Sequence, residues 1–294
     1  MIFPYKKTDR GEIRQGEISF GTLTGWGGVL LGLLLSMVWG ASLGGCSFET
    51  RSKTASLCVA GSTSVQPFAE KLAEVFMNLH PEVRIDVQGG GSSAGIFAAR
   101  QGAADLGASS RELAGDEKDL VEIPIAYDGI AVIVHPTNPL ENLGLETLRE
   151  IFQGKIRDWG ELGLKAHAIH LITREEGSGT RNAFEEMVMG KSEITPAALV
   201  QDSNGAVREI VANDPHALGY ISVGLVDHRV KAVKIEGVPP TRDNIRSHTY
   251  KLVRRFILVS RLPPRGCAKE FVDFILSAKG QSLLEAEGLV GIVE

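Results

Sequence analysis

The sequence has little cysteine, no excess of basic residues and no complete motif for nucleotide binding. It carries 3 cysteines and a formal net charge of -5 over 294 residues, so it lacks the basic footprint of a nucleic-acid-binding protein. No cysteines and histidines are spaced as in a metal site. No segment matches the full P-loop pattern, and Ser178 is not framed by the Gly-x-Ser-x-Gly of a hydrolase. We therefore expect no nucleic-acid partner, no metal or other cofactor, and no enzymatic activity.

The amino-terminal residues have the pattern of a secretory signal that ends in a lipid-attachment site. A basic leader precedes an apolar run over residues 26–43, which ends in Leu-Gly-Gly followed by Cys46. This ending resembles the bacterial lipobox, in which the cysteine is lipidated. We expect residues 1–46 to be a signal peptide with a lipobox and residues 47–56 to be a tether. An uncleaved transmembrane anchor is the alternative, and either arrangement places the rest of the chain outside the cytoplasm.

Two cysteines remain after the lipobox, Cys58 and Cys267. In an oxidising compartment they could form a disulfide. They could equally be two small hydrophobic residues, each packed in its own surroundings. The sequence leaves both possibilities open.

From residue 57 onward, strand-like and helix-like segments alternate, which is typical of an α/β architecture. A strand is expected at residues 57–60, followed by a helix in which apolar residues recur at helical spacing and Ser64 is the N-cap. Further strands are expected at residues 83–87, 105–110, 130–134, 169–173, 218–222 and 256–259, and helices at residues 94–101 and 145–152.

Three loops share one design, in which glycine, serine and threonine lie between a strand and a helix. They are residues 61–64, 89–93 and 177–180, and the third follows Arg174 closely. A helix N-terminus offers unpaired backbone N–H groups, and hydroxyls add further donors, so each loop could hold an anion. For a single loop, ordinary helix capping explains the composition as well. Three such loops in one chain favour a shared oxyanion site.

Several segments resemble the signature blocks of phosphate-binding proteins of bacterial ABC importers, in order along residues 57–294. They are residues 61–67 (GSTSVQP), 89–92 (GGGS), 128–134 (DGIAVIV), 154–156 (GKI), 173–181 (TREEGSGTR) and 219–222 (GYIS). The resemblance implies a two-lobed, periplasmic-binding-protein-like fold with the ligand in a cleft between the lobes. Lobe one would take residues 57–134 plus 248–294, and lobe two residues 135–247.

The resemblance also implies which residues contact the ligand. Carried over position by position, the phosphate-binding set is Thr63, Ser64, Ser92, Arg174, Ser178, Gly179 and Thr180, together with Ser62 and Gly91. A better-known branch of the family has an aspartate after the serine of a further loop, where this chain has Ser110 and Arg111. We expect Asp128 to accept the proton of hydrogen phosphate instead, with Arg111 orienting its carboxylate, and Asp105 is the alternative acceptor.

The resemblance implies an extracytoplasmic lipoprotein that binds inorganic phosphate and delivers it to an ABC importer. Its expected partners are phosphate, the permease subunits and the membrane through the lipid anchor, and we expect a monomer. Two alternatives stay open, a lipoprotein that senses phosphate without feeding a transporter and one that binds another oxyanion such as sulfate. Sulfate carries no proton at neutral pH, so a buried acceptor would discriminate against it.

Overall fold

The computed structural model describes residues 55–292, which form a mixed α/β fold around one curled sheet. The expected signal peptide, Cys46 and nearly all of the expected tether lie outside the described residues. The strands are β1 (Ala55–Gly61), β2 (Val83–Gly89), β3 (Leu106–Ser109), β4 (Val121–Val134), β5 (Asn142–Leu143), β6 (His170–Arg174), β7 (Leu199–Gln201), β8 (Ala217–Ser222), β9 (Lys231–Ala232), β10 (Lys234–Ile235), β11 (Val253–Ser260) and β12 (Val290–Gly291).

Eight α-helices cover the sheet, and the alternation of helices and strands that the sequence predicted is confirmed. They are α1 (Gln66–Leu79), α2 (Ser92–Gln101), α3 (Leu145–Phe152), α4 (Gly179–Phe184), α5 (Asn204–Asn213), α6 (Arg242–Arg246), α7 (Cys267–Leu276) and α8 (Ala278–Ala286). Short 3-10 turns occur at Gly115–Asp119, Trp159–Leu162 and Val223–Leu225, and a π-helical turn at Glu185–Met189 continues α4. Among the described residues, none of these helices has the length and apolar character needed to cross a bilayer.

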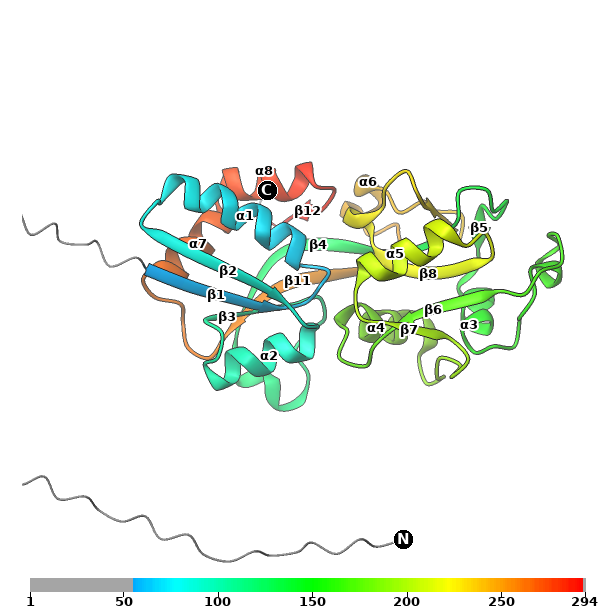
Figure 1. The fold of residues 1–294 in the computed structure, drawn as a ribbon, viewed down its shortest axis with the longest axis horizontal. Helices are drawn as coiled ribbons and strands as arrows, with labels where there is room; N and C mark the ends of the chain where they lie inside the picture. Colours follow the sequence, from blue (N-terminus) through cyan, green and yellow to red (C-terminus); the bar gives the residue numbers. More distant parts are fainter. Residues whose placement is uncertain (1–54, 293–294) are drawn as a thin grey trace, which may run out of the picture. The chain divides into compact units, whose positions relative to one another are not determined.

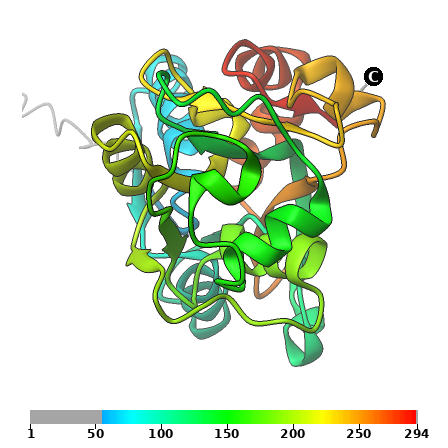
Figure 2. The same ribbon diagram turned by 90° about the vertical axis from the view of Figure 1, so that its right-hand side faces the viewer.

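The two largest of four hydrophobic clusters among the described residues lie in different lobes (Figure 1). In one core Phe76 of α1 packs edge-on against Phe271 of α7, with ring centroids 5.4 Å apart. In the other core the rings of Phe184 and Tyr220 stack 4.1 Å apart. The blue and red segments of Figure 1 share the first lobe, and in Figure 2 the green segments of the second lobe lie in front of them. The chain therefore leaves the first lobe, builds the second and returns.

The crossing is made by the two long strands β4 and β11. The sheet order is β2-β1-β3-β11-β4-β8-β6-β7, and β4 is 14 residues long rather than the five that the sequence predicted. It pairs with β11 up to Gly129 and with β8 from Ile130 onward. This exchange of partners falls ahead of the expected boundary at residue 134. The lobe limits of 57–134 plus 248–294 and 135–247 stay a prediction.

The strand directions bring the predicted anion loops together. Strands β2 and β3 both run parallel to β1, so their carboxyl ends lie at one edge of the sheet. The 61–64 loop, the 89–91 loop and Ser110 all follow those ends, as expected for ligand-binding loops of parallel sheets. In the second lobe the 175–178 loop follows the carboxyl end of β6.

The predicted N-cap of the first helix is wrong. The N-cap residue of α1 is Val65, and no side chain caps the helix. The hydroxyl of Ser64 instead contacts Thr180 at 2.6 Å and accepts from Asn204 at 2.9 Å. The hydroxyl of Ser64 therefore contacts residues that are distant in the sequence and does not cap the helix.

Cys58 and Cys267 both carry free thiols in the described part of the chain. Each is half-buried, and this burial raises the pKa of both thiols. A raised pKa keeps a thiol protonated and unreactive at neutral pH. The structure thus favours the interpretation that these cysteines are two small packed residues.

Helix α2 packs so closely on the sheet that Gly95→Ala is expected to destabilise the fold. An added Cβ would lie 2.4 Å from the carbonyl oxygen of Ala60 and 2.5 Å from the Cα of Gly61. Such overpacking costs about 1–3 kcal/mol, which exceeds the gain of up to about 1 kcal/mol of alanine over glycine in a helix. The free energy of unfolding, measured by denaturant titration, should fall.

The matched control is Gly205→Ala in α5, where an added Cβ would meet only the Oγ of Ser203, at 3.9 Å. This variant should be as stable as the wild type or more stable. Equal stability of the two alanine variants would contradict the close packing of α2.

Candidate functional site

Polar side chains from both lobes meet where the predicted loops converge, and nearly all of them are buried. Each residue of this cluster is at most 2% exposed: Ser62, Ser64, Ser92, Ser110, Arg174, Ser178 and Thr180. Every one was predicted as a site residue. Buried polar groups require hydrogen-bond partners, so the contacts within the cluster indicate what it can bind.

Three serines from three loops form a connected group of hydroxyls. The Oγ of Ser62 donates to the Oγ of Ser110 at 2.9 Å, and the backbone N–H of Ser110 donates to the Oγ of Ser92 at 3.1 Å. A Cβ on Gly179 would lie 2.3 Å from the Oγ of Ser92 and 2.6 Å from that of Ser110. Only glycine allows the start of α4 to approach these hydroxyls so closely. Residues 62, 92, 110 and 179 therefore belong to one site.

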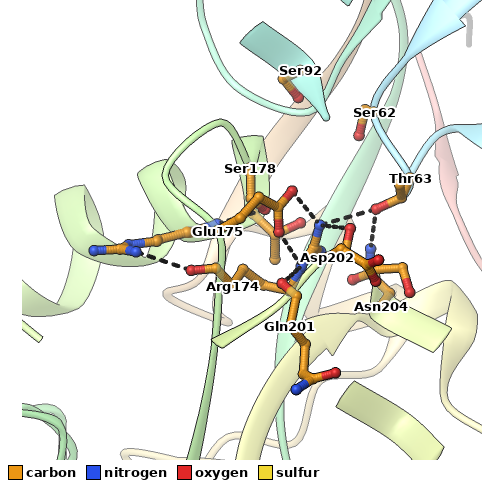
Figure 3. Close-up of polar contacts among 12 residues, drawn as sticks. Ser62, Thr63, Ser92, Arg174, Glu175, Ser178, Gln201, Asp202 and Asn204 are labelled. Atoms are coloured by element: carbon orange, nitrogen blue, oxygen red, sulfur yellow. Dashed lines mark hydrogen bonds and ion pairs between the residues drawn. The ribbon is translucent and has the colours of Figure 1, made fainter. Parts of the chain in front are cut away.

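The guanidinium of Arg174 lies at the centre of the contacts drawn in Figure 3. Its Nε donates to Glu175 at 3.0 Å and to the carbonyl of Gln201 at 3.2 Å. Its Nη2 donates to the hydroxyl of Thr63 at 3.0 Å and the carbonyl of Asp202 at 3.1 Å. Its Nη1 is buried and has no hydrogen-bond partner among the described residues. Leaving a charged donor unpaired is costly, so this nitrogen marks the place of an acceptor.

Arg174 also forms an ion pair with Glu175, the next residue in the chain, and this is not a surface pair. Glu175 lies 2.9 Å from Nη2, and its side chain is 30% exposed. The side chain of Arg174 is only 1% exposed. The carboxylate thus helps to hold the buried cation without covering all of it.

Asp128 has other partners than the expected ones. Its Oδ2 accepts from the Nε of Arg254 at 2.9 Å, and its Oδ1 accepts from the hydroxyl of Ser222 at 2.7 Å. Burial raises the pKa of Asp128, an effect that Arg254 and Ser222 oppose. The expected partner Arg111 instead forms a bidentate pair with Glu117, at 2.6 and 2.8 Å. The expected pairing of Arg111 with Asp128 is therefore wrong.

The alternative acceptor Asp105 lies at the opposite end of β3 from Ser110. It is exposed, and its carboxylate accepts from the backbone N–H of Cys58 at 2.8 Å. A strand rises about 3.3 Å per residue, so the five positions between Asp105 and Ser110 hold it away from the cluster. Asp105 is not brought to the site.

Three buried residues of this region were missed by sequence reasoning: Arg254 of β11, Ser222 of β8 and Asn204 of α5. Each is at most 6% exposed. The Nδ2 of Asn204 donates to Ser64, and its Oδ1 accepts from the backbone N–H of Ser222 at 3.2 Å. The only local signal was Ser203-Asn204-Gly205, which looks like an ordinary helix start. Arg254 lies in a run of apolar and basic residues that suggests no site.

Comparisons with known proteins agree with the fold. A family model described as a PBP superfamily domain matches residues 49–279. The phosphate-binding protein PstS of Bacillus subtilis is 34% identical over 246 residues, which cover 81% of each chain. A substrate-binding protein of Clostridium perfringens, crystallised with bound phosphate, is 42% identical with a TM-score of 0.79, over 81% of this chain and 100% of that one. An ABC-type phosphate transport receptor of Vibrio cholerae is 37% identical with a TM-score of 0.67, over 80% and 99%.

The buried pair of Asp128 and Arg254 predicts a strong dependence of stability on both partners. Arg254→Met should lower the free energy of unfolding by about 3–5 kcal/mol, because it leaves a buried carboxylate without its cation. The double variant Asp128→Asn with Arg254→Met should lose less than the sum of the two single losses. Denaturant titration of the four proteins measures both effects.

Arg255→Met provides the matched control on the same strand. The side chain of Arg255 is 34% exposed and pairs with the exposed carboxylate of Glu112, and such surface pairs contribute about 0–1 kcal/mol. Additive losses in the double variant, or a loss for Arg254→Met no larger than that of the control, would show that the buried pair is unimportant.

Proposed function

This chain belongs to the PBP superfamily and, within it, to the phosphate-binding proteins of bacterial ABC importers, and we propose that it captures inorganic phosphate outside the cytoplasm and delivers it to an ABC importer. The members of this family are substrate-binding proteins, not enzymes. One observation supports the proposal above the others, the buried Nη1 of Arg174 without a partner among the described residues. It lies in a cluster of hydroxyls, all of which can donate to an oxyanion.

We propose that the ligand contacts come from both lobes. The set consists of Thr63, Ser64, Ser92, Arg174, Ser178, Gly179 and Thr180. The hydroxyls of Ser62 and Ser110 belong to the same cluster. The first turn of α2 adds backbone N–H groups and a partial positive charge. Arg174 adds a full charge, which the protein needs locally because its net charge is -5. Since one chain supplies every proposed contact, we propose that it acts as a monomer with the permease subunits as partners.

Asp128 and Arg111 take supporting roles in this proposal. The carboxylate of Asp128 is engaged by Arg254, Ser222 and the backbone N–H of Val223, which fill most of the about four acceptor positions of a carboxylate. We therefore propose that the main role of Asp128 is to hold Arg254 and Ser222 in place next to the site. Arg111 donates to the hydroxyl of Ser93 at 3.2 Å and so steadies the start of α2.

Calorimetric titration of the full chain with phosphate, arsenate and sulfate tests the function. Phosphate and its close analogue arsenate should bind, and sulfate should bind more weakly. Preference for sulfate would instead favour the other oxyanion that the sequence left open. If phosphate binds but its uptake is unchanged in cells that lack this chain, the sensing alternative gains support.

Arg174→Ala should weaken phosphate binding by roughly 2–5 kcal/mol, the typical effect of removing one partner of a buried charged contact. Arg174→Lys should recover part of the loss, because it keeps the charge but not the planar fork that matches two phosphate oxygens. Arg229→Ala serves as the control, since this partly exposed arginine pairs with Asp227 and Glu209 in the second lobe. A loss below tenfold for Arg174→Ala would contradict its role as the main cation.

We propose that residues 1–46 form a signal peptide and that Cys46 is lipidated, which would tether the protein to the membrane. The proposal is based on the apolar run that ends in Leu-Gly-Gly-Cys. Cys46→Ser should abolish the incorporation of labelled fatty acid and release the protein from the membrane fraction. Cys58→Ser, which alters a half-buried cysteine of β1, should leave labelling intact. Fatty-acid labelling of the Cys46→Ser variant would disprove the anchor.

A further inference from the structure

The side-chain amide of Asn204 lies between the end of β8 and the 61–64 loop, and its orientation is determined by its neighbours. Asn204 is the first residue of α5 and is 1% exposed. Its Oδ1 accepts from the backbone N–H of Ser222 at 3.2 Å. Because that N–H can only donate, the amide oxygen must face Ser222 and the Nδ2 must face the loop.

The Nδ2 of Asn204 reaches two of the proposed ligand hydroxyls. It donates to the Oγ of Ser64 at 2.9 Å. It donates more weakly to the Oγ1 of Thr63 at 3.4 Å (Figure 3). The Oγ1 of Thr63 also accepts from the Nη2 of Arg174 at 3.0 Å. A hydroxyl has one proton and two lone pairs. Both lone pairs of Thr63 are thus taken by donors, and one lone pair of Ser64 is taken by Asn204.

This arrangement controls the direction in which the hydroxyls donate. A hydroxyl whose lone pairs accept from fixed donors can use its proton only towards another acceptor. For Thr63 both fixed donors are buried, so its proton is free for an oxygen of the ligand. Without the amide, the hydroxyl of Thr63 would keep only one fixed donor and could turn its proton away from the anion. The hydroxyl of Ser64 also lies 2.6 Å from that of Thr180, where either of the two can donate.

We propose that Asn204 is a positioning residue, which directs the hydroxyl of Thr63 to donate to the bound anion, holds the hydroxyl of Ser64 and so ties α5 to the 61–64 loop. The inference rests on the proposed binding of phosphate. It adds a residue that no motif contains and that acts through two hydroxyls. The contacts continue from Asn204 through Ser222 to Asp128. The buried ion pair therefore helps to fix the amide through Ser222.

The decisive variant is Asn204→Asp, which keeps the shape of the side chain but replaces a donor by an acceptor. At pH 8 the carboxylate should weaken phosphate binding at least about tenfold relative to the wild type, because a donor is lost and a like charge is added. At pH 5 the ratio to the wild type should shrink, because burial and the bound anion raise the pKa of the new carboxyl, and its protonated form donates as the amide does. Asn213→Asp places the same charge at the exposed far end of α5 and should stay within about threefold at both pH values.

A double-variant cycle tests the same idea without adding a charge. It replaces the first experiment if thermal melting shows that Asn204→Asp does not fold. Asn204→Ala should weaken phosphate binding about tenfold in the wild-type background and clearly less in the Ser64→Ala background. Equal losses in both backgrounds, or a penalty of Asn204→Asp that is the same at pH 5 and pH 8, would overturn the positioning role while leaving phosphate binding intact. Failure of the wild-type chain to bind phosphate would overturn the proposed function and this inference with it.

Discussion

The buried ion pair between Asp128 and Arg254 is the interaction on which the rest of the site depends. The two residues are cross-strand partners on β4 and β11, the strands that connect the lobes. Removing both charges from water is expensive, and their attraction offsets that expense only when the remaining donors and acceptors are satisfied. Ser222 and the carbonyl of Ser110 supply part of these partners from the two sides. The pair therefore joins elements of both lobes at the position where the chain crosses between them.

The polar cluster next to this pair is subject to one constraint: many hydrogen-bond donors are gathered where water does not reach them. Serine and threonine hydroxyls, the guanidinium of Arg174 and the backbone N–H groups at the start of α2 all offer hydrogens. Such a set is stable only if its donors find acceptors. Some of these donors bond to one another, as the hydroxyls of Ser64 and Thr180 do at 2.6 Å. The Nη1 of Arg174, which has no partner among the described residues, is suited to an oxyanion. The contact between Ser64 and Thr180 joins residues of the two expected lobes.

Much of this was readable in the sequence, and the parts that were not share one cause. The strand-loop-helix segments around residues 61–64, 89–93 and 177–180 were predicted because composition and periodicity are local signals. The length of β4 was underestimated, because Pro124 and the polar residues near it interrupt the apolar pattern on which the prediction relied. The pairing of Arg111 with Asp128 was wrong, because Arg111 pairs with Glu117 and β11 carries Arg254 to the carboxylate of Asp128 from 126 positions away.

The sequence by itself determined the class of fold and predicted the three glycine-rich loops and the cation near them as a site, because glycine, hydroxyls and arginine at helix starts have physical consequences wherever they occur. Only the tertiary structure decided how those loops are held. Asn204 and Arg254 lie in unremarkable local sequence, and Ser222 ends the 219–222 block without having been predicted as a site residue. Their roles come from partners brought near by the crossing of β4 and β11. Hydrogen bonds and ion pairs act over a few ångströms of space regardless of separation along the chain, so a support made of distant residues becomes visible only once the chain is folded.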